Sequence, residues 1–148
     1  MINVIHPVAG TIAILMIATF WLSTVLSDLF ASHAIVTAVK TAIPWGFLLL
    51  IPALIATGAS GFGLAKGRRT GLIGAKIKRM PLIAANGILV LIPCALVLAS
   101  KAKAGEFDSV FYTVQVLELL AGAVNIALIG LSMRDGLKLT GRFRRNPV

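Results

Sequence analysis

Four long apolar stretches constrain the fold of this chain more than any other feature. They run over residues 8–29, 42–65, 81–100 and 109–133. A helix of about 20 mostly apolar residues spans the hydrocarbon core of a bilayer, which is about 30 Å thick. Hydrophobic residues make up 58% of the chain and charged residues only 13%, which excludes an ordinary soluble domain. We therefore expect an all-α integral membrane protein with four transmembrane helices.

The segments between these stretches are short, so consecutive helices should pack antiparallel in an up-down-up-down bundle. Residues 1–148 would form this single domain, with a basic loop at 66–80 and a basic tail at 134–148. The residues before the first stretch carry no basic side chain, and the stretch is too long for the core of a signal peptide. We interpret it as a retained helix.

Basic residues predict the orientation of the bundle. Eleven of the fourteen fall in the central loop and the tail: Lys66, Arg68, Arg69, Lys76, Lys78, Arg79, Arg134, Lys138, Arg142, Arg144 and Arg145. Only Lys40, Lys101 and Lys103 fall on the other side. The positive-inside rule then places both termini and the central loop in the cytoplasm. This pattern is similar to that of small inner-membrane proteins of bacteria, so we expect a multi-pass protein of the cell inner membrane.

The same charges indicate partners. A basic tail next to a transmembrane helix is typical of contact with anionic lipid headgroups. We expect this contact rather than nucleic-acid binding, and we expect a homo-oligomer or a partner in a membrane complex.

One acidic residue, Glu118, lies inside the fourth apolar stretch. Ionisable residues within membrane spans are costly and face the protein interior, so each is a candidate functional residue. Gln115, Gly122 and Asn125 are spaced to share its helix face, and Phe111 and Tyr112 extend that face outward. The sequence therefore predicts a polar site on one face of the fourth helix.

The other helices supply candidate partners for Glu118. They are Thr19, Ser23, Thr24, Ser27 and Trp21 in the first helix, Trp45 in the second and Asn86 in the third. Burial disfavours a charged carboxylate, so Glu118 should be protonated at neutral pH unless a cation lies beside it. Lys40 is expected instead near the outer surface, paired with Asp28 or extended towards water.

Prolines lie near the middle of two of the helices. Pro52 and Pro93 each remove a backbone donor and free the carbonyl four residues earlier, at Leu48 and Leu89. Both helices should kink there, at the level of a midplane site around Glu118. Met80-Pro81 reads as the start of the third helix, because proline favours a first helical position.

Histidine provides an alternative chemistry. His6 lies at the mouth of the first helix and could be an axial ligand of a b-type haem, with Met80 or Met133 as the second ligand. His33 is too far along the chain to ligate the same haem within one subunit.

Three functions follow as hypotheses. The first is a site at Glu118 that binds or transports a proton, a cation or a small amphiphile, and would use Gln115, Asn125, Asn86, Tyr112, Thr19 and Ser23. The second is a haem subunit for electron transfer, and the third is an accessory or assembly subunit without its own chemistry. No catalytic, metal-cluster or phosphate-loop motif occurs in the sequence, so an enzyme is not expected.

Overall fold

A computed structural model describes residues 2–65, 67 and 71–139, and within these residues the fold is entirely helical. Four segments are long and apolar enough to cross a membrane, which confirms the predicted four-helix membrane fold. The elements are α1 (Ile2–Phe30), α2 (His33–Ala65), α3 (Gly71–Asn86), a short π-helical segment η1 (Gly87–Leu91), α4 (Ile92–Ala104) and α5 (Ser109–Leu139). Segments α3, η1 and α4 follow one another without a break and form the third span.

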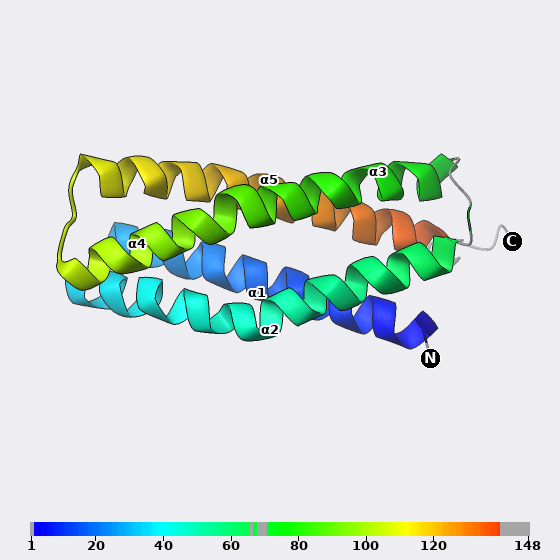
Figure 1. Ribbon diagram of the computed structural model, residues 1–148, viewed down its shortest axis with the longest axis horizontal. Helices are drawn as coiled ribbons and strands as arrows, with labels where there is room; N and C mark the ends of the chain where they lie inside the picture. The colour runs from blue at the N-terminus through cyan, green and yellow to red at the C-terminus, as the bar shows by residue number, and fades with distance from the viewer. Residues whose placement is uncertain (1, 66, 68–70, 140–148) are drawn as a thin grey trace, which may run out of the picture.

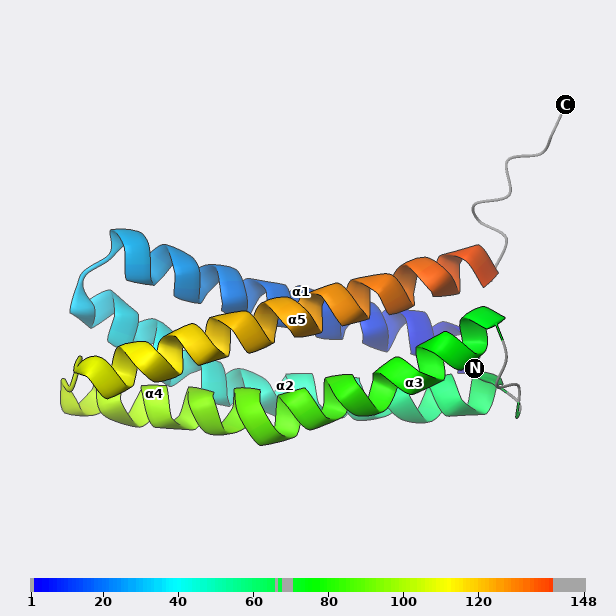
Figure 2. The ribbon, with the colours of Figure 1, turned by 90° about the horizontal axis from the view of Figure 1, so that it is seen from above.

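The helices lie side by side as one elongated bundle (Figure 1). Residues 31–32 join α1 to α2, and residues 105–108 join α4 to α5, at the same end of the molecule, which we call the loop end. The start of α1 and the end of α5 lie at the opposite, terminal end (Figure 2). Contacts link α1 to α2, α2 to α4, α4 to α5 and α5 to α1, so the bundle closes around a central core.

Three helices begin earlier than expected, and the first of them begins at Ile2 rather than at residue 8. The second begins at His33 rather than at residue 42, so Lys40 belongs to a helix and not to a connection. The third begins at Gly71 rather than at residue 81, and Pro81 lies inside α3. Most of the expected basic loop is therefore helical. The expected basic residues Lys66, Arg68, Arg69, Arg142, Arg144 and Arg145 lie outside the described residues.

Pro93 is preceded by a π-helical turn, η1, in which the Ile92 amide donates to the Gly87 carbonyl. Because Pro93 has no amide hydrogen to bond Leu89, the wider turn occurs where the α-helical pattern is already interrupted. Pro52 lies inside α2, which continues on both sides of it. Both proline rings are exposed on the outer surface of the bundle.

Two apolar clusters fill the core. One, near the middle, contains Ala13, Ile17, Leu50, Ala53 and Ile129, and the other, at the loop end, contains Val36, Leu98, Ala102 and Phe111. The outer surface is also apolar, and Trp45 is 75% exposed there. An apolar exterior is what a span needs in lipid.

The connection before α5 is held by Asp108. Its Oδ1 accepts a hydrogen bond from the Phe111 amide at 2.8 Å, and its Oδ2 accepts one from Lys101 Nζ at 2.9 Å. The Lys101 hydrogen bond, followed by the Phe111 amide, lowers the pKa of Asp108 below its usual value. Asp108 thus caps α5 as a carboxylate.

Candidate functional site

The polar face of α5 points into the bundle. Gln115 and Asn125 are buried, and Glu118 between them is only 12% exposed. Phe111 continues the same face and is buried, whereas Tyr112 lies off it and is 50% exposed. Glu118 lies nearer to the start of α5 than to its end, so the site is displaced from the middle of the bundle towards the loop end.

Glu118 forms an ion pair with Lys40 of α2. Lys40 Nζ lies 2.7 Å from Glu118 Oε2, and the Lys40 side chain is 1% exposed. The same ammonium donates to Thr24 Oγ1 of α1 at 3.2 Å. Three spans therefore meet at one buried charge pair. Lys40 neither pairs with Asp28 nor extends towards water, because α2 carries it inward to Glu118.

This pairing changes the expected state of Glu118. A cation does lie beside the carboxylate, and it is supplied by the protein. Each charge alone would be costly inside a membrane span, and each compensates the other. The two charges therefore offset each other as long as the Lys40 ammonium stays in contact with the carboxylate.

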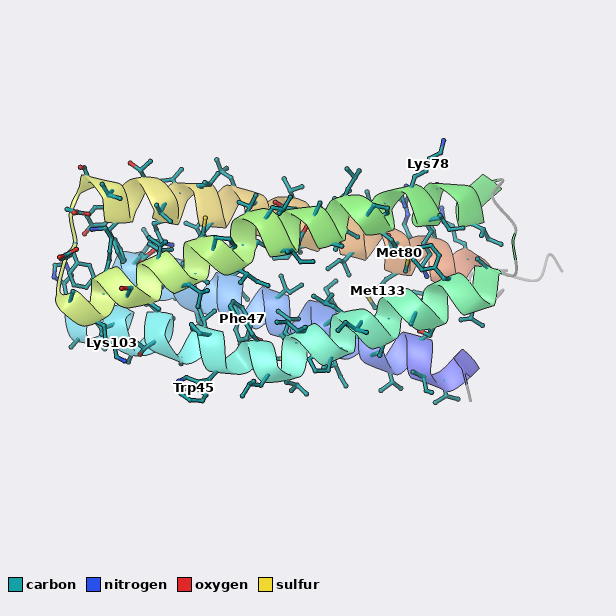
Figure 3. The ribbon with its side chains drawn as sticks, in the orientation of Figure 1. Trp45, Phe47, Lys78, Met80, Lys103 and Met133 are labelled. Carbon is teal, nitrogen blue, oxygen red and sulfur yellow. The ribbon has the colours of Figure 1, made fainter. Side chains whose placement is uncertain are left out.

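A cavity of about 60 Å³ adjoins the ion pair. Glu118 and Thr24 line its polar side. Its other walls are apolar or aromatic: Ile17, Phe20, Trp21, Ile43, Phe47, Leu50, Leu91, Ala95, Leu119 and Gly122. Phe47 is labelled in Figure 3, on the loop-end half of α2. Since water occupies about 30 Å³ in the liquid, the space admits small solutes or a proton-carrying water but no drug-sized molecule.

Trp21 closes the cavity against α5. Its Nε1 donates to the Leu119 carbonyl at 2.9 Å. A Cβ atom at Gly122 would lie 2.8 Å from Trp21 Cδ1, so only glycine leaves room for the indole at this crossing. The other candidate donor, Trp45, faces outward.

Asn86 bonds to Asn125 rather than to Glu118. Asn86 Nδ2 donates to Asn125 Oδ1 at 2.9 Å and to the Ala121 carbonyl at 2.8 Å. Asn125 Nδ2 donates in turn to the Ile83 carbonyl at 3.4 Å. This pair fastens α3 to α5 beyond the cavity.

The first helix contributes a different residue from those expected to bind. Thr19 is exposed, and its hydroxyl donates to the Leu15 carbonyl of its own helix at 2.7 Å. Ser23 is half-buried, and the buried Thr24 contacts Lys40. Lys40 itself was absent from the predicted site. Its spacing from the buried Val36 and Ile43 places it on the inner face of α2, and this periodicity could have identified it.

Gln115 is the least satisfied polar group of the site. It is 4% exposed, and within the described part of the chain neither atom of its amide has a hydrogen-bond partner. Leaving a buried polar group unpaired costs about 1–3 kcal/mol.

His6 lies in a second polar cluster, near the terminal end. Its Nδ1 donates to the Thr57 carbonyl at 3.1 Å, since a carbonyl can only accept, and it lies 3.0 Å from Ser60 Oγ. Its Nε2 therefore accepts a hydrogen bond from Lys76 Nζ at 2.9 Å. Close by, Arg79 Nη1 lies 2.6 Å from Oδ2 of the buried Asp135.

Two of the candidate haem ligands, Met80 and Met133, lie in the terminal-end half of the bundle (Figure 3). Met80 lies against Gly61, as does the His6 ring, and Met133 packs on the central apolar cluster. Both ring nitrogens of His6 already have protein partners, so ligation of iron would have to break one of these contacts. The haem hypothesis stays a prediction that no feature of this cluster favours. Among the described residues, no group of three or more His, Cys, Asp or Glu side chains could hold a metal ion.

Comparisons of the chain with protein-family models, with curated proteins and with solved structures found no match. The fold itself defines the class: a multi-pass helical membrane protein with a buried ion pair between two of its spans.

Proposed function

We propose that this protein takes up and releases a proton at Glu118 as part of transport across the inner membrane. The observation that carries the proposal is the Lys40 to Glu118 ion pair, enclosed between spans and next to a small cavity. Buried carboxylates and lysines inside membrane spans mark proton relays and ion pathways. We place the helices in an up-down-up-down arrangement with both termini in the cytoplasm, as the distribution of basic residues indicates.

A proton suits this site better than the other expected ligands. The Lys40 ammonium already occupies the position that a bound cation would take, at 2.7 Å from the carboxylate. A small amphiphile would need more than the 60 Å³ that the cavity offers. A proton needs no such space: it adds to Glu118 Oε2, neutralises the carboxylate and leaves the positive charge on Lys40.

Proton flux through purified protein in lipid vesicles tests the proposal. A potassium gradient with valinomycin sets an interior-negative potential, and a trapped pH dye reports acidification. We expect wild-type vesicles to acidify faster than protein-free vesicles, and Glu118→Gln vesicles to show only the protein-free leak, because glutamine keeps the shape but cannot bind the proton. Glu106→Gln, which changes an exposed acid of the connecting loop, should retain wild-type flux.

Two outcomes would contradict the proposal: wild-type flux equal to that of protein-free vesicles, or undiminished flux in Glu118→Gln. In the first case the ion pair would only hold the helices together, as expected for an accessory or assembly subunit. Contacts with anionic headgroups and with further subunits remain predictions.

A further inference from the structure

We propose that Gln115 is the positioning residue that receives the Lys40 ammonium when Glu118 takes up its proton. This inference rests on the proposed proton binding at Glu118 and assigns a task to a buried side chain of the site that has no partner among the described residues. It concerns the protonated state, in which the ion pair is broken.

Protonation of Glu118 creates a difficulty for Lys40. In the ion pair, two of the three ammonium hydrogens are directed to Glu118 Oε2 and Thr24 Oγ1. Once the carboxylate is neutral, the ammonium loses the counter-charge in contact with it, while it remains in a side chain that is only 1% exposed. A buried charge needs hydrogen bonds to replace those of water, and within the described part of the chain Thr24 is the hydrogen-bond partner of Lys40 besides Glu118.

Gln115 offers the missing acceptor. Its Oε1 is buried and unpaired within the described residues, and it belongs to the same helix face as Glu118. Lys40 reaches this face of α5 at Glu118, and residues three apart on a helix have Cβ atoms about 5–6 Å apart. The flexible lysine side chain would have to move along the face by that spacing to meet Gln115. The ammonium can move from Glu118 to Gln115 while Lys40 stays inside the bundle.

Charged groups of two neighbouring spans act on the ion pair. Lys40 of α2 is the cation in contact with Glu118, and Asp28 of α1 interacts electrostatically with Lys40. Helix α1 also contributes the uncharged Thr24 and Trp21, and α4 contributes Ala95 and the Cys94 thiol, which interacts electrostatically with both charges of the pair. The affinity of Glu118 for a proton therefore depends on which groups can accept hydrogen bonds from the Lys40 ammonium.

Infrared spectroscopy of the full chain in lipid nanodiscs tests this inference. The carbonyl band of a protonated carboxyl, assigned by its loss in Glu118→Gln, is followed against pH. In Gln115→Leu the displaced ammonium has no acceptor, so Glu118 should bind its proton about tenfold more weakly, and the titration midpoint should fall by about one pH unit. In Gln115→Glu a second carboxylate can hold the ammonium, so the midpoint should rise.

Thr113→Val is the matched control, because Thr113 is exposed on the other face of α5 and its hydroxyl donates to the Ser109 carbonyl of its own helix. Its midpoint should equal that of wild type. A wild-type midpoint retained in both Gln115 variants would overturn the inference and leave the proposed function intact. Absence of any titrating Glu118 band in the wild-type protein would instead overturn the proposed function itself.

Discussion

A lysine that is 1% exposed within a membrane span depends on its partner. Lys40 meets Glu118 across 78 positions of sequence, and Thr24 supports the contact from a third helix. The cost of removing both charges from water offsets much of the attraction between them. The pair therefore stabilises the bundle mainly because neither charge is left uncompensated. Removing one partner should therefore cost more than removing both.

Lys40→Met leaves the Glu118 carboxylate buried and unpaired. We expect a loss of about 3–5 kcal/mol in the free energy of unfolding, measured by circular dichroism during titration with a denaturing detergent. The double variant Lys40→Met with Glu118→Leu should recover this loss, since replacing a buried pair by apolar groups is often neutral or stabilising.

Lys103→Met serves as the control for this pair of variants. Lys103 is exposed at the loop end (Figure 3), so its replacement should leave the unfolding transition at its wild-type position. An equal loss in the free energy of unfolding in Lys40→Met and in the double variant would contradict this expectation. It would show that the two side chains stabilise the bundle by packing and not by their charges.

The contact between α1 and α5 depends on a close approach at Gly122. The indole of Trp21 occupies the space where a side chain at this position would stand, and its Nε1 is tied to the Leu119 carbonyl. Small residues allow such approaches between membrane helices, where packing rather than the hydrophobic effect drives association. This crossing also forms one wall of the cavity beside Glu118.

Gly122→Ala should displace the indole and destabilise the bundle by about 1–3 kcal/mol. Fluorescence of Trp21, read in a Trp45→Phe background, should shift as the indole loses its hydrogen bond. Gly130→Ala on the same helix is the control, because nothing lies within 4 Å of its added methyl group. Unchanged fluorescence in Gly122→Ala would mean that the Trp21 indole does not pack against Gly122.

Hydropathy predicted that four spans exist but not where they begin. Residues 33–41 and 71–80 contain polar and basic side chains, so an apolar window excludes them, although their backbone hydrogen bonds continue the helices. The helical spacing of Gln115 and Asn125 predicts that both side chains face the interior of the bundle, and both are buried. The same spacing does not predict the hydrogen bond between Asn86 and Asn125. That contact depends on how far α3 and α5 are displaced along each other, which side-chain packing determines and the sequence of one chain does not reveal.

At the scale of the whole molecule, the described basic residues outside the core gather at the terminal end. Lys78 projects outward there, while Lys103 lies at the loop end (Figure 3). Lys40 is buried and paired with Glu118, so it does not add to the positive charge at the surface of the loop end. Lys101 and Lys103 are the other two lysines expected at that end. The difference in basic residues between the two ends, which the positive-inside rule uses, is therefore larger than the sequence alone indicates.

Cysteine labelling tests the proposed orientation, in a Cys94→Ala background. A membrane-impermeant maleimide should label Lys103→Cys in intact spheroplasts and Lys78→Cys only in inverted inner-membrane vesicles. The reverse pattern would place the termini outside. Labelling of both sites from both sides would indicate a mixed orientation.

The long sequence separation between Lys40 and Glu118 also has a consequence for biosynthesis. At about 5–20 residues per second, the ribosome needs about 4–16 s to extend the chain over the 78 positions from Lys40 to Glu118. During this interval α2 enters the membrane with an uncompensated lysine, which costs about 2.5–3.5 kcal/mol at the centre of a span and is offset by the apolar residues around it. Until Glu118 has been made, Lys40 has no carboxylate in contact with it, so α2 should be less stable in the membrane before α5 is added than after.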